Sequence, residues 1–477
     1  MKKLLNILQP LIDHLYIFQL YEYQSIYLLK WFLRHPFKRR VQQKQHIEYT
    51  SHIKALLIIT LGLMSFVSYF LSAGFASFFL IIILFLQISP LFIVIAELIF
   101  KPLEMYQRNK IVSRAIAKRK RLKDLQVIAI VGSYAKTSTK NMLYTLLWKD
   151  FKVVKTPKSY NTELSIARSM LADLKENTEL FICEMDAYHT GEIDKLCQIA
   201  QPTHGVITAI GPQHLERFGS MDKLVSSQFE LAKFIANQRV SESAKQSDKG
   251  ILFLNQMDEH SAKTGTKLEQ TVFFYNNDSA FISDRIENEH GQTFTLTIRQ
   301  SKITIHLPIL GEHQAINFLA AAVIADYLGL PLKTIAQRAE LITFTEHRLE
   351  VKTVGNLTIL DNTYNANPKA AEASLHLLHS YKFRQKILVT PGFVELGKEH
   401  NKAHKEFAKS AAGVIDDIII VGEHAKKPIL QGLESAKFNK KNIHLAETTQ
   451  KALEHISTIS KENAVVLLEN DLPDQYS

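Results

Sequence analysis

The stretch from Val131 to Lys140, "VGSYAKTSTK", contains residue types that could bind phosphate. The apolar run "LQVIAI" before it is typical of a buried strand, and "TSTKNMLYTLLWKD" within and after it has the apolar spacing of a helix. A loop between a strand and a helix directs backbone N–H groups and the positive end of the helix dipole at an anion. Lys136 could reach outer phosphates, and Thr137 could hold a magnesium ion. The stretch therefore indicates nucleotide phosphate chemistry.

This loop departs from the usual phosphate-loop pattern at two positions. The pattern has glycine directly before the lysine and again six residues before it, where this chain has Ala135 and Ile130. If Ala135 has a positive φ, its methyl group costs about 1 kcal/mol or more. Taken alone, the ten residues are as compatible with a chance strand, turn and helix as with a phosphate loop.

Two later apolar strands also end in polar side chains. "FICEMD" places Glu184 and Asp186 at the end of one strand, and "TAIGPQHLERFGS" places His214 and Glu216 just beyond another. Open α/β sheets bind ligands beyond the carboxyl ends of their strands. Magnesium takes oxygen ligands, so a glutamate near the Lys-Thr pair suits this ion. A lone histidine is more often structural, and only its setting in a polar loop favours a functional His214.

The elements around these residues predict an α/β fold. From Leu125 onward, apolar strands alternate with helical segments, which indicates a mostly parallel sheet. "QTFTLTI" and "KITIHLPI" alternate with period two and predict an antiparallel hairpin. Near residue 345 the alternation starts again. We therefore predict a P-loop-type central domain over residues 124–344 and a Rossmann-like domain over residues 345–477.

Composition and charge limit the class of protein. The chain has 477 residues and two cysteines, which is too few for a disulfide framework or a cysteine metal cluster and fits a reducing compartment. Residues 1–124 carry a net charge of about +12 and the remainder about −2, by the residue types in the sequence. Because the basic residues gather beside an apolar tract rather than on the α/β part, a nucleic-acid partner is not expected.

That apolar tract predicts a membrane region over residues 1–110. Residues 55–100 hold no charge before Glu97, and the tract is about twice the ~20 residues that one spanning helix needs. A small-residue break divides it into two expected helices, about 54–71 and 75–98. Basic residues flank both outer ends, which predicts cytoplasmic ends. A buried hairpin in a soluble core is the alternative, and residues 1–35 fit either an interfacial helix or core packing.

Eight segments, in order over residues 125–470, resemble the Mur ligase family of ATP-dependent amide-bond ligases in peptidoglycan synthesis. The resemblance is closest to the branch that adds D-alanyl-D-alanine. "LLENDLPDQY" near the end and "QLYEYQSIYLLKWFL" near the start resemble a membrane-anchored subgroup. The eight segments are "GSYAKTSTK", "YNTELSIARSML", "EMDAYHTGEI", "HLERFGS", "GEHQAINFLAA", "EHRLE", "DNTYNANPKA" and "VTPGFVELGKEHN".

The resemblance implies ATP and Mg²⁺ as cofactors and assigns roles by position. The implied catalytic residues are Lys136, Glu184 and His214. The implied magnesium ligands are Thr137, Glu184 and His214. The implied ATP contacts are Gly132, Ser133, Lys136, Thr137, Ser138, His313, Asn317, Arg348 and Asp361. The implied substrate contacts are Asn161, Thr162, Asn365 and Asn367. From the residues alone, Asn365 and Asn367 also fit a turn and helix start, and His313 also fits a cap region.

The implied reaction joins a carboxylate to an amine through an acyl phosphate. Two negatively charged groups must meet, so charge neutralisation by lysine and magnesium would carry most of the catalysis. The expected partners are a nucleotide- or lipid-linked cell-wall precursor, an amino acid or dipeptide, the lipid bilayer and cell-wall synthesis proteins. The expected location is the bacterial inner membrane, with the ligase domains in the cytoplasm.

Three departures from the family leave other functions open. Ala135 replaces the loop glycine, and Gln228 stands where the family often has a lysine modified by carbon dioxide. The expected membrane helices occupy the place of the family's domain for the uridine-nucleotide sugar. A catalytically impaired scaffold that binds nucleotide is therefore one alternative. A related ligase that builds another polymer, such as a polyglutamate-type chain, is a second.

Overall fold

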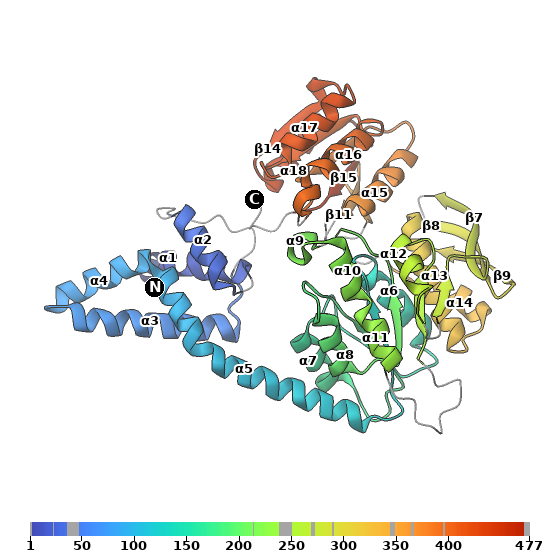
Figure 1. Cartoon of the computed structure of the whole chain (residues 1–477). Coiled ribbons are helices and arrows are strands. Elements are labelled where there is room, and N and C mark those ends of the chain that lie inside the picture. Colours follow the sequence, from blue (N-terminus) through green and yellow to red (C-terminus); the bar gives the residue numbers. More distant parts are fainter. Residues whose placement is uncertain are drawn as a thin grey trace. The chain divides into compact units, whose positions relative to one another are not determined.

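The computed structural model describes residues 2–21, 23–35, 47–212, 214–237, 250–268, 272–288, 291–343, 349–363, 367–394 and 396–471. The chain divides into two compact units (Figure 1). The first reaches Lys110 and is helical, whereas the second, Ile111–Asp471, holds the sheets.

The first unit is built from helices around a small apolar core. Its helices are α1 (Lys2–Leu20), α2 (Ser25–Arg34), α3 (Ser51–Leu71), α4 (Phe75–Gln87) and the first part of α5 (Ser89–Arg121). Figure 1 shows α3 and α4 side by side. Buried residues from these helices form one cluster that includes Leu11, Phe18, Leu28, Leu56 and Leu86.

The structure agrees with one of the two predicted membrane helices and differs from the other. The first corresponds to α3, which is long and apolar enough to cross a membrane. The second is wrong as one helix, because α4 and α5 meet at an angle of 84°. Pro90 lies in the first turn of α5, where its missing N–H is tolerated, but it cannot continue the hydrogen bonds of the helix before it.

A parallel six-stranded sheet forms the centre of the second unit, which confirms the predicted α/β class. The strand order is β2-β3-β1-β4-β5-β6, and all the pairs are parallel. The strands are β1 (Gln126–Val131), β2 (Val153–Lys155), β3 (Leu180–Glu184), β4 (His204–Ile207), β5 (Leu252–Asn255) and β6 (Val272–Tyr275). Since β1 lies between β3 and β4, the loops after these three strands meet at one edge.

Alternate residues of β1 face two different helical layers. Ile128 and Ile130 belong to a core with α6 (Lys136–Leu147) and α13 (Glu312–Tyr327). Val127 and Val131 belong to a core on the other face. The helices that contribute to this second core include α7 (Glu163–Asp173), α8 (Glu192–Ala200), α10 (Met221–Gln228) and α11 (Glu230–Asn237). This two-sided burial explains why β1 is apolar throughout.

A small antiparallel sheet contains the predicted hairpin and one more strand. The hairpin is β8 (Gly291–Ile298) with β9 (Ser301–Leu307), and β7 (Ala280–Asn288) pairs with β8. The register of β7 shifts between Ser283 and Ile286. This irregularity breaks the period-two pattern, so β7 was not predicted as a strand.

The second six-stranded sheet has the order β10-β11-β15-β12-β13-β14, and only its β10–β11 pair is antiparallel. Its strands are β10 (Glu350–Val354), β11 (Leu357–Asn362), β12 (Lys386–Thr390), β13 (Asp417–Val421), β14 (Ile443–Ala446) and β15 (Val465–Glu469). The main helices beside it are α15 (Pro368–Ser380), α16 (His400–Ala412), α17 (Lys426–Ser435) and α18 (Thr449–Ile459). The predicted boundary near residue 345 lies in residues 344–348, outside the described residues.

Candidate nucleotide site

The loop between β1 and α6 is held against the end of β4. Gly132 has a φ of +138°, and a Cβ there would lie 2.2 Å from Thr208 Oγ1. Ser133 donates its backbone N–H to the Ala209 carbonyl at 2.8 Å, and its hydroxyl donates to the Gly211 carbonyl at 2.9 Å. Glycine is therefore required at position 132 by both conformation and space. The loop is a fixed turn.

Ala135 adopts the left-handed conformation that the sequence raised as a question. Its φ is +70° and its ψ is −7°, directly before the first residue of α6. An L-residue in this region carries roughly 1–2 kcal/mol of strain that glycine avoids. The loop thus has a left-handed backbone conformation at a position where this chain has alanine rather than glycine.

Lys136 is buried and turned back onto protein groups. Its Nζ donates to the Gly132 carbonyl at 2.5 Å and forms an ion pair with Asp186 Oδ2 at 3.1 Å. Asp186 follows β3, so two neighbouring strand ends supply this pair. The ammonium group is thus held at the mouth of the loop, where a phosphate could replace Asp186 as its partner.

Glu184 is the centre of a buried polar cluster at the end of β3. Thr137 donates its hydroxyl to Glu184 Oε1 at 3.0 Å, and Asn161 Nδ2 lies 3.5 Å from the same oxygen. Lys140 forms an ion pair with Glu184 Oε2 at 2.8 Å, and both of these side chains are almost fully buried. One carboxylate oxygen therefore faces the loop hydroxyl, and the other faces a lysine.

Lys140, which pairs with the cavity residue Glu184 without lining the cavity itself, was not predicted from the sequence. It follows Lys136 by four residues on α6, so both lie on the same face of the helix. Its Nζ also donates to the Lys158 carbonyl. The spacing within "KTSTK" was the available signal, because a second lysine one turn into a phosphate-loop helix is directed toward the same strand ends.

One cavity brings together most of the predicted site residues. Asn362, which was not predicted, also lines it. The predicted residues that line the cavity are Ser133, Lys136, Thr137, Ser138, Asn161, Glu184, His214, His313, Asn317 and Asn367. They come from the loop after β1, from the ends of neighbouring strands, from α13 and from the segment before α15. The cavity therefore receives residues of both six-stranded domains.

His214 and His313 lie at the cavity in different surroundings. The His214 ring packs edge-on against Tyr188, with centroids 4.5 Å apart. Burial lowers the pKa of His313 to about 4, and the charge of Arg285 acts in the same direction. His313 is therefore neutral at pH 7, and its Nδ1 has no hydrogen-bond partner among the described residues. A neutral ring with an unpaired nitrogen suits an uncharged heterocycle better than a phosphate.

Five other predicted residues either do not line the cavity or lie outside the described residues. Thr162 is exposed and caps α7, where its hydroxyl contacts Ser165 Oγ at 2.9 Å. Asp361 pairs with Lys352 Nζ at 2.7 Å and does not line the cavity. Gly132 shapes the loop without lining the cavity. Arg348 and Asn365 lie outside the described residues.

Asn362 enters the cavity where Asp361 was expected. Its Nδ2 donates to Glu469 Oε1 at 2.9 Å and to Ser374 Oγ at 3.0 Å. Burial raises the pKa of Glu469 to about 8, although its hydrogen bonds to Ser374 and Asn362 act against this. Because both amide hydrogens have protein acceptors, the amide orientation is fixed. The signal in the sequence was the polar end of the strand "LTILDN". The prediction selected Asp361, and the cavity is lined by the next residue, Asn362.

The residues at the loop fit one magnesium ion. The Thr137 hydroxyl and Glu184 Oε1 are 3.0 Å apart, and both residues line the cavity. A hydroxyl and a carboxylate oxygen are suitable ligands for this hard cation. Gln228 is buried with its Oε1 unpaired among the described residues, and it does not line the cavity. Gln228 therefore gives no evidence for a second magnesium ion in this chain.

The fold and site place the chain in a class of ligases. Residues 130–325 match the Mur ligase middle domain, and residues 347–469 match the Mur ligase glutamate ligase domain. The chain belongs to the Mur ligase family. This confirms the resemblance seen in the sequence.

Within the family, its relatives point to one branch. The chain is 31% identical over 283 residues to the UDP-N-acetylmuramoyl-tripeptide–D-alanyl-D-alanine ligase of Bacillus subtilis, which covers 59% of each chain. Identity to the Rickettsia prowazekii ligase of the same name is 26%, covering 78% of this chain and 83% of that one. The chain thus spans about three fifths of the length of the first of these relatives.

Solved structures of the same branch share the fold. MurF from Acinetobacter baumannii superposes with a TM-score of 0.66 at 24% identity, covering 76% of this chain and 77% of that one. The MurF ligase from Thermotoga maritima in complex with ADP gives 0.64 at 24% identity, covering 76% and 80%. At this identity the likeness concerns the fold.

The predicted location at the bacterial inner membrane is wrong, and the comparisons give no support for the bilayer as a partner. The relatives and solved structures that the chain matches are named as ligases of this family, not as membrane proteins. By length and composition, the described residues include one helix that could span a membrane, or two if the bent pair is one span. Part of the apolar tract instead packs inside the first unit, where Leu56, Met64 and Leu86 are buried.

Proposed function

We propose that this chain uses ATP to join a peptidoglycan-precursor carboxylate to an amine, with an acyl phosphate as intermediate. The amine is D-alanyl-D-alanine or a closely related dipeptide, by analogy with the relatives' names. The observation that carries the proposal is the meeting of Lys136, Thr137 and Glu184 at one cavity. A phosphate-loop lysine beside an oxygen pair is what nucleotide activation of a carboxylate requires.

The loop and α6 would receive the phosphates of ATP. Backbone N–H groups at the start of α6 supply partial positive charge. Lys136 exchanges its ion pair with Asp186 for one with phosphate, so it neutralises charge without moving out of the loop. Thr137 and Glu184 would hold a magnesium ion, whose charge offsets that of the phosphates. Lys140 keeps the far carboxylate oxygen of Glu184 paired throughout.

Asn362 and Asn367 would serve the amine side of the reaction. Both line the same cavity as Lys136, but they come from the second six-stranded domain. Since both hydrogens of the Asn362 amide are donated to Ser374 and Glu469, its Oδ1 remains as an acceptor. An acceptor fixed in this way can orient an amine N–H toward the activated carbonyl carbon. We accordingly propose residues 124–344 as the nucleotide domain and residues 345–477 as the amine-side domain.

The proposal is tested by phosphate release from ATP by the purified full chain. The reaction would contain the UDP-linked muramoyl tripeptide and D-alanyl-D-alanine, and hydroxylamine would trap an acyl phosphate as a hydroxamate. Lys136→Ala should lose phosphate release and trapping. Lys149→Ala removes an exposed lysine beyond α6 and should leave both unchanged.

A second candidate is a nucleotide-binding scaffold without turnover. Two observations favour it: the strained backbone of Ala135, and the Gln228 Oε1, which has no hydrogen-bond partner among the described residues. In that case the chain would bind nucleotide in a Lys136-dependent manner but release no phosphate above the Lys136→Ala level with any acceptor. Turnover with glutamate in place of the dipeptide would instead support the polyglutamate-type ligase.

A further inference from the structure

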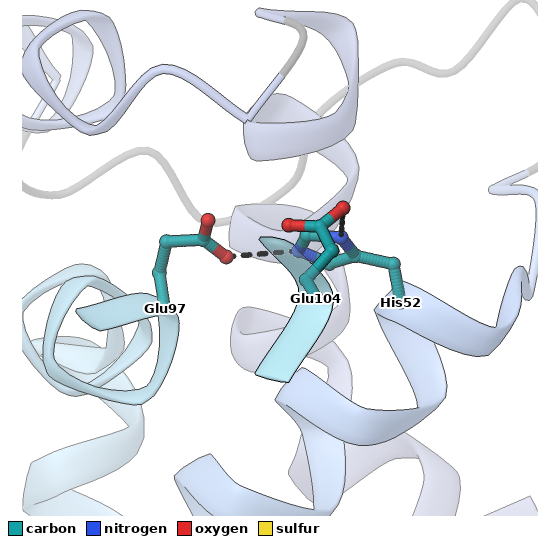
Figure 2. Close-up of side chains that lie close together, drawn as sticks. All are labelled: His52, Glu97 and Glu104. Carbon is teal, nitrogen blue, oxygen red and sulfur yellow. Dashed lines mark hydrogen bonds and ion pairs between the residues drawn. The ribbon is translucent and has the colours of Figure 1, made fainter. Parts of the chain in front are cut away.

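A second cluster of ligating side chains lies in the first unit, outside the nucleotide cavity. His52 is in the first turn of α3, and Glu97 and Glu104 lie two turns apart on α5 (Figure 2). The His52 Nε2 contacts Glu97 Oε2 at 2.8 Å, and its Nδ1 contacts Glu104 Oε1 at 3.0 Å. The seven-residue spacing puts both carboxylates on one face of α5. The imidazole of α3 and the two carboxylates of α5 therefore lie together between these helices.

The ring of His52 is held in place on its faces as well as at its nitrogens. The Tyr23 ring stacks on it with centroids 4.2 Å apart, and the Phe100 ring meets it edge-on at 5.3 Å. The His52 side chain is 13% exposed and that of Glu97 is 8% exposed, whereas Glu104 is 43% exposed. The cluster is thus largely shielded, with Glu104 on its open side.

The charges in this cluster do not balance. Two carboxylates face one imidazole, which carries at most one positive charge, so a net negative charge remains. Among the described residues, no cationic side chain other than His52 pairs with Glu97 or Glu104. The shielded Glu97 carboxylate has to share one imidazole charge with Glu104, and a shielded carboxylate without a full counter-charge is costly. A divalent cation bound with a neutral imidazole would bring the sum to zero.

We propose that His52, Glu97 and Glu104 bind one divalent transition metal ion of the zinc, manganese or iron class. One ligand atom from each residue can be chosen so that all three lie within 4.8 Å of one another. Nitrogen plus carboxylate oxygen suits these borderline ions, whereas magnesium and calcium prefer oxygen alone. With one His52 nitrogen on the ion, the other stays hydrogen-bonded to a carboxylate oxygen, which fixes the ring. The ion would join the start of α3 to α5.

The test is metal binding by the full chain without an affinity tag, after removal of metal by a chelator. Zinc binding would be followed by calorimetry, and cobalt binding by its visible absorption. Excess magnesium and the variant Glu184→Gln would exclude the nucleotide site from the signal. We expect one ion per chain and a rise in the melting temperature on zinc addition.

Variants distinguish this site from other histidines. His52→Gln and Glu104→Gln should each weaken zinc binding by at least roughly 10- to 100-fold. His306→Gln changes an exposed histidine of β9 and should have no effect. Since Glu104 is on the open side, its variant should fold even if His52→Gln does not. No zinc binding by the wild type, or binding that is unchanged in Glu104→Gln, would overturn the proposal and leave the cluster as an ion-paired contact.

Discussion

Ala135→Gly is expected to stabilise the second unit. Ala135 has a φ of +70° and a ψ of −7°, where an L-residue carries roughly 1–2 kcal/mol of strain. Glycine removes this strain but increases the entropy of the unfolded chain, which costs roughly 0.4–1 kcal/mol. These two ranges leave a net gain of about 0.8 kcal/mol, midway between roughly 0 and 1.6 kcal/mol. For a domain of this size, that corresponds to a rise of about 1–4 °C in melting temperature.

Thermal unfolding followed by circular dichroism measures this gain, and ATP turnover is measured on the same samples. Lys437→Gly is a matched control, because Lys437 also has a positive φ, +57°, and lies far along the chain from the loop. We expect both variants to raise the melting temperature. Only Ala135→Gly should change the Michaelis constant for ATP, because only Ala135 lines the cavity.

The strain argument fails if Ala135→Gly lowers the melting temperature while Lys437→Gly raises it. That result would mean that the Ala135 methyl group makes contacts worth more than the backbone strain. An unchanged melting temperature in both variants would show that positive φ carries no measurable cost in this chain.

Three further predictions concern buried polar groups. Lys140→Met should destabilise the chain by about 3–5 kcal/mol, because it leaves the Glu184 carboxylate without its partner; adding Glu184→Gln should recover part of this loss in urea unfolding. Burial raises the pKa of Glu469 from 4.5 to about 8, so the folded state keeps a proton that the unfolded state loses, and stability falls as pH rises through this window. The free energy of unfolding of Glu469→Gln, relative to that of the wild type, should therefore rise by on the order of 3 kcal/mol between pH 4.5 and 7. If the unfolding free energies of the two proteins depend on pH in the same way, this effect is excluded. Asn362→Ala should raise the Michaelis constant for the amine at least about tenfold and leave that for ATP unchanged, as measured by phosphate release.

The sequence was sufficient for the parts of the fold that follow local periodicity. The central strands around β1 are buried on both faces, so they read as continuous apolar runs, and their pairing with helices predicted the parallel sheet. The sequence was insufficient where tertiary packing determines how the helices are arranged. The apolar tract of the first unit has the composition of spanning helices, but a proline-linked bend and core packing gave a different arrangement.

The residues of the candidate site could be predicted where a sequence motif determines the backbone conformation. They were harder to predict where a role depends on which side chain another one contacts. Lys136, Thr137 and Glu184 follow from strand-end geometry, and the structure brings them together. Lys140 was missed because its role depends on an ion pair across two elements. Asn362 was missed in favour of Asp361, which Lys352 binds instead. Such choices between adjacent residues need three-dimensional contacts.

Product analysis by mass spectrometry tests the central claim most directly. The wild-type chain would be incubated with ATP, magnesium, the UDP-linked muramoyl tripeptide and D-alanyl-D-alanine, beside Lys136→Ala. The account predicts a product whose mass is the sum of tripeptide precursor and dipeptide less one water, formed only by the wild type. Nucleotide binding that depends on Lys136, without any amide product from this or a lipid-linked precursor, would contradict it.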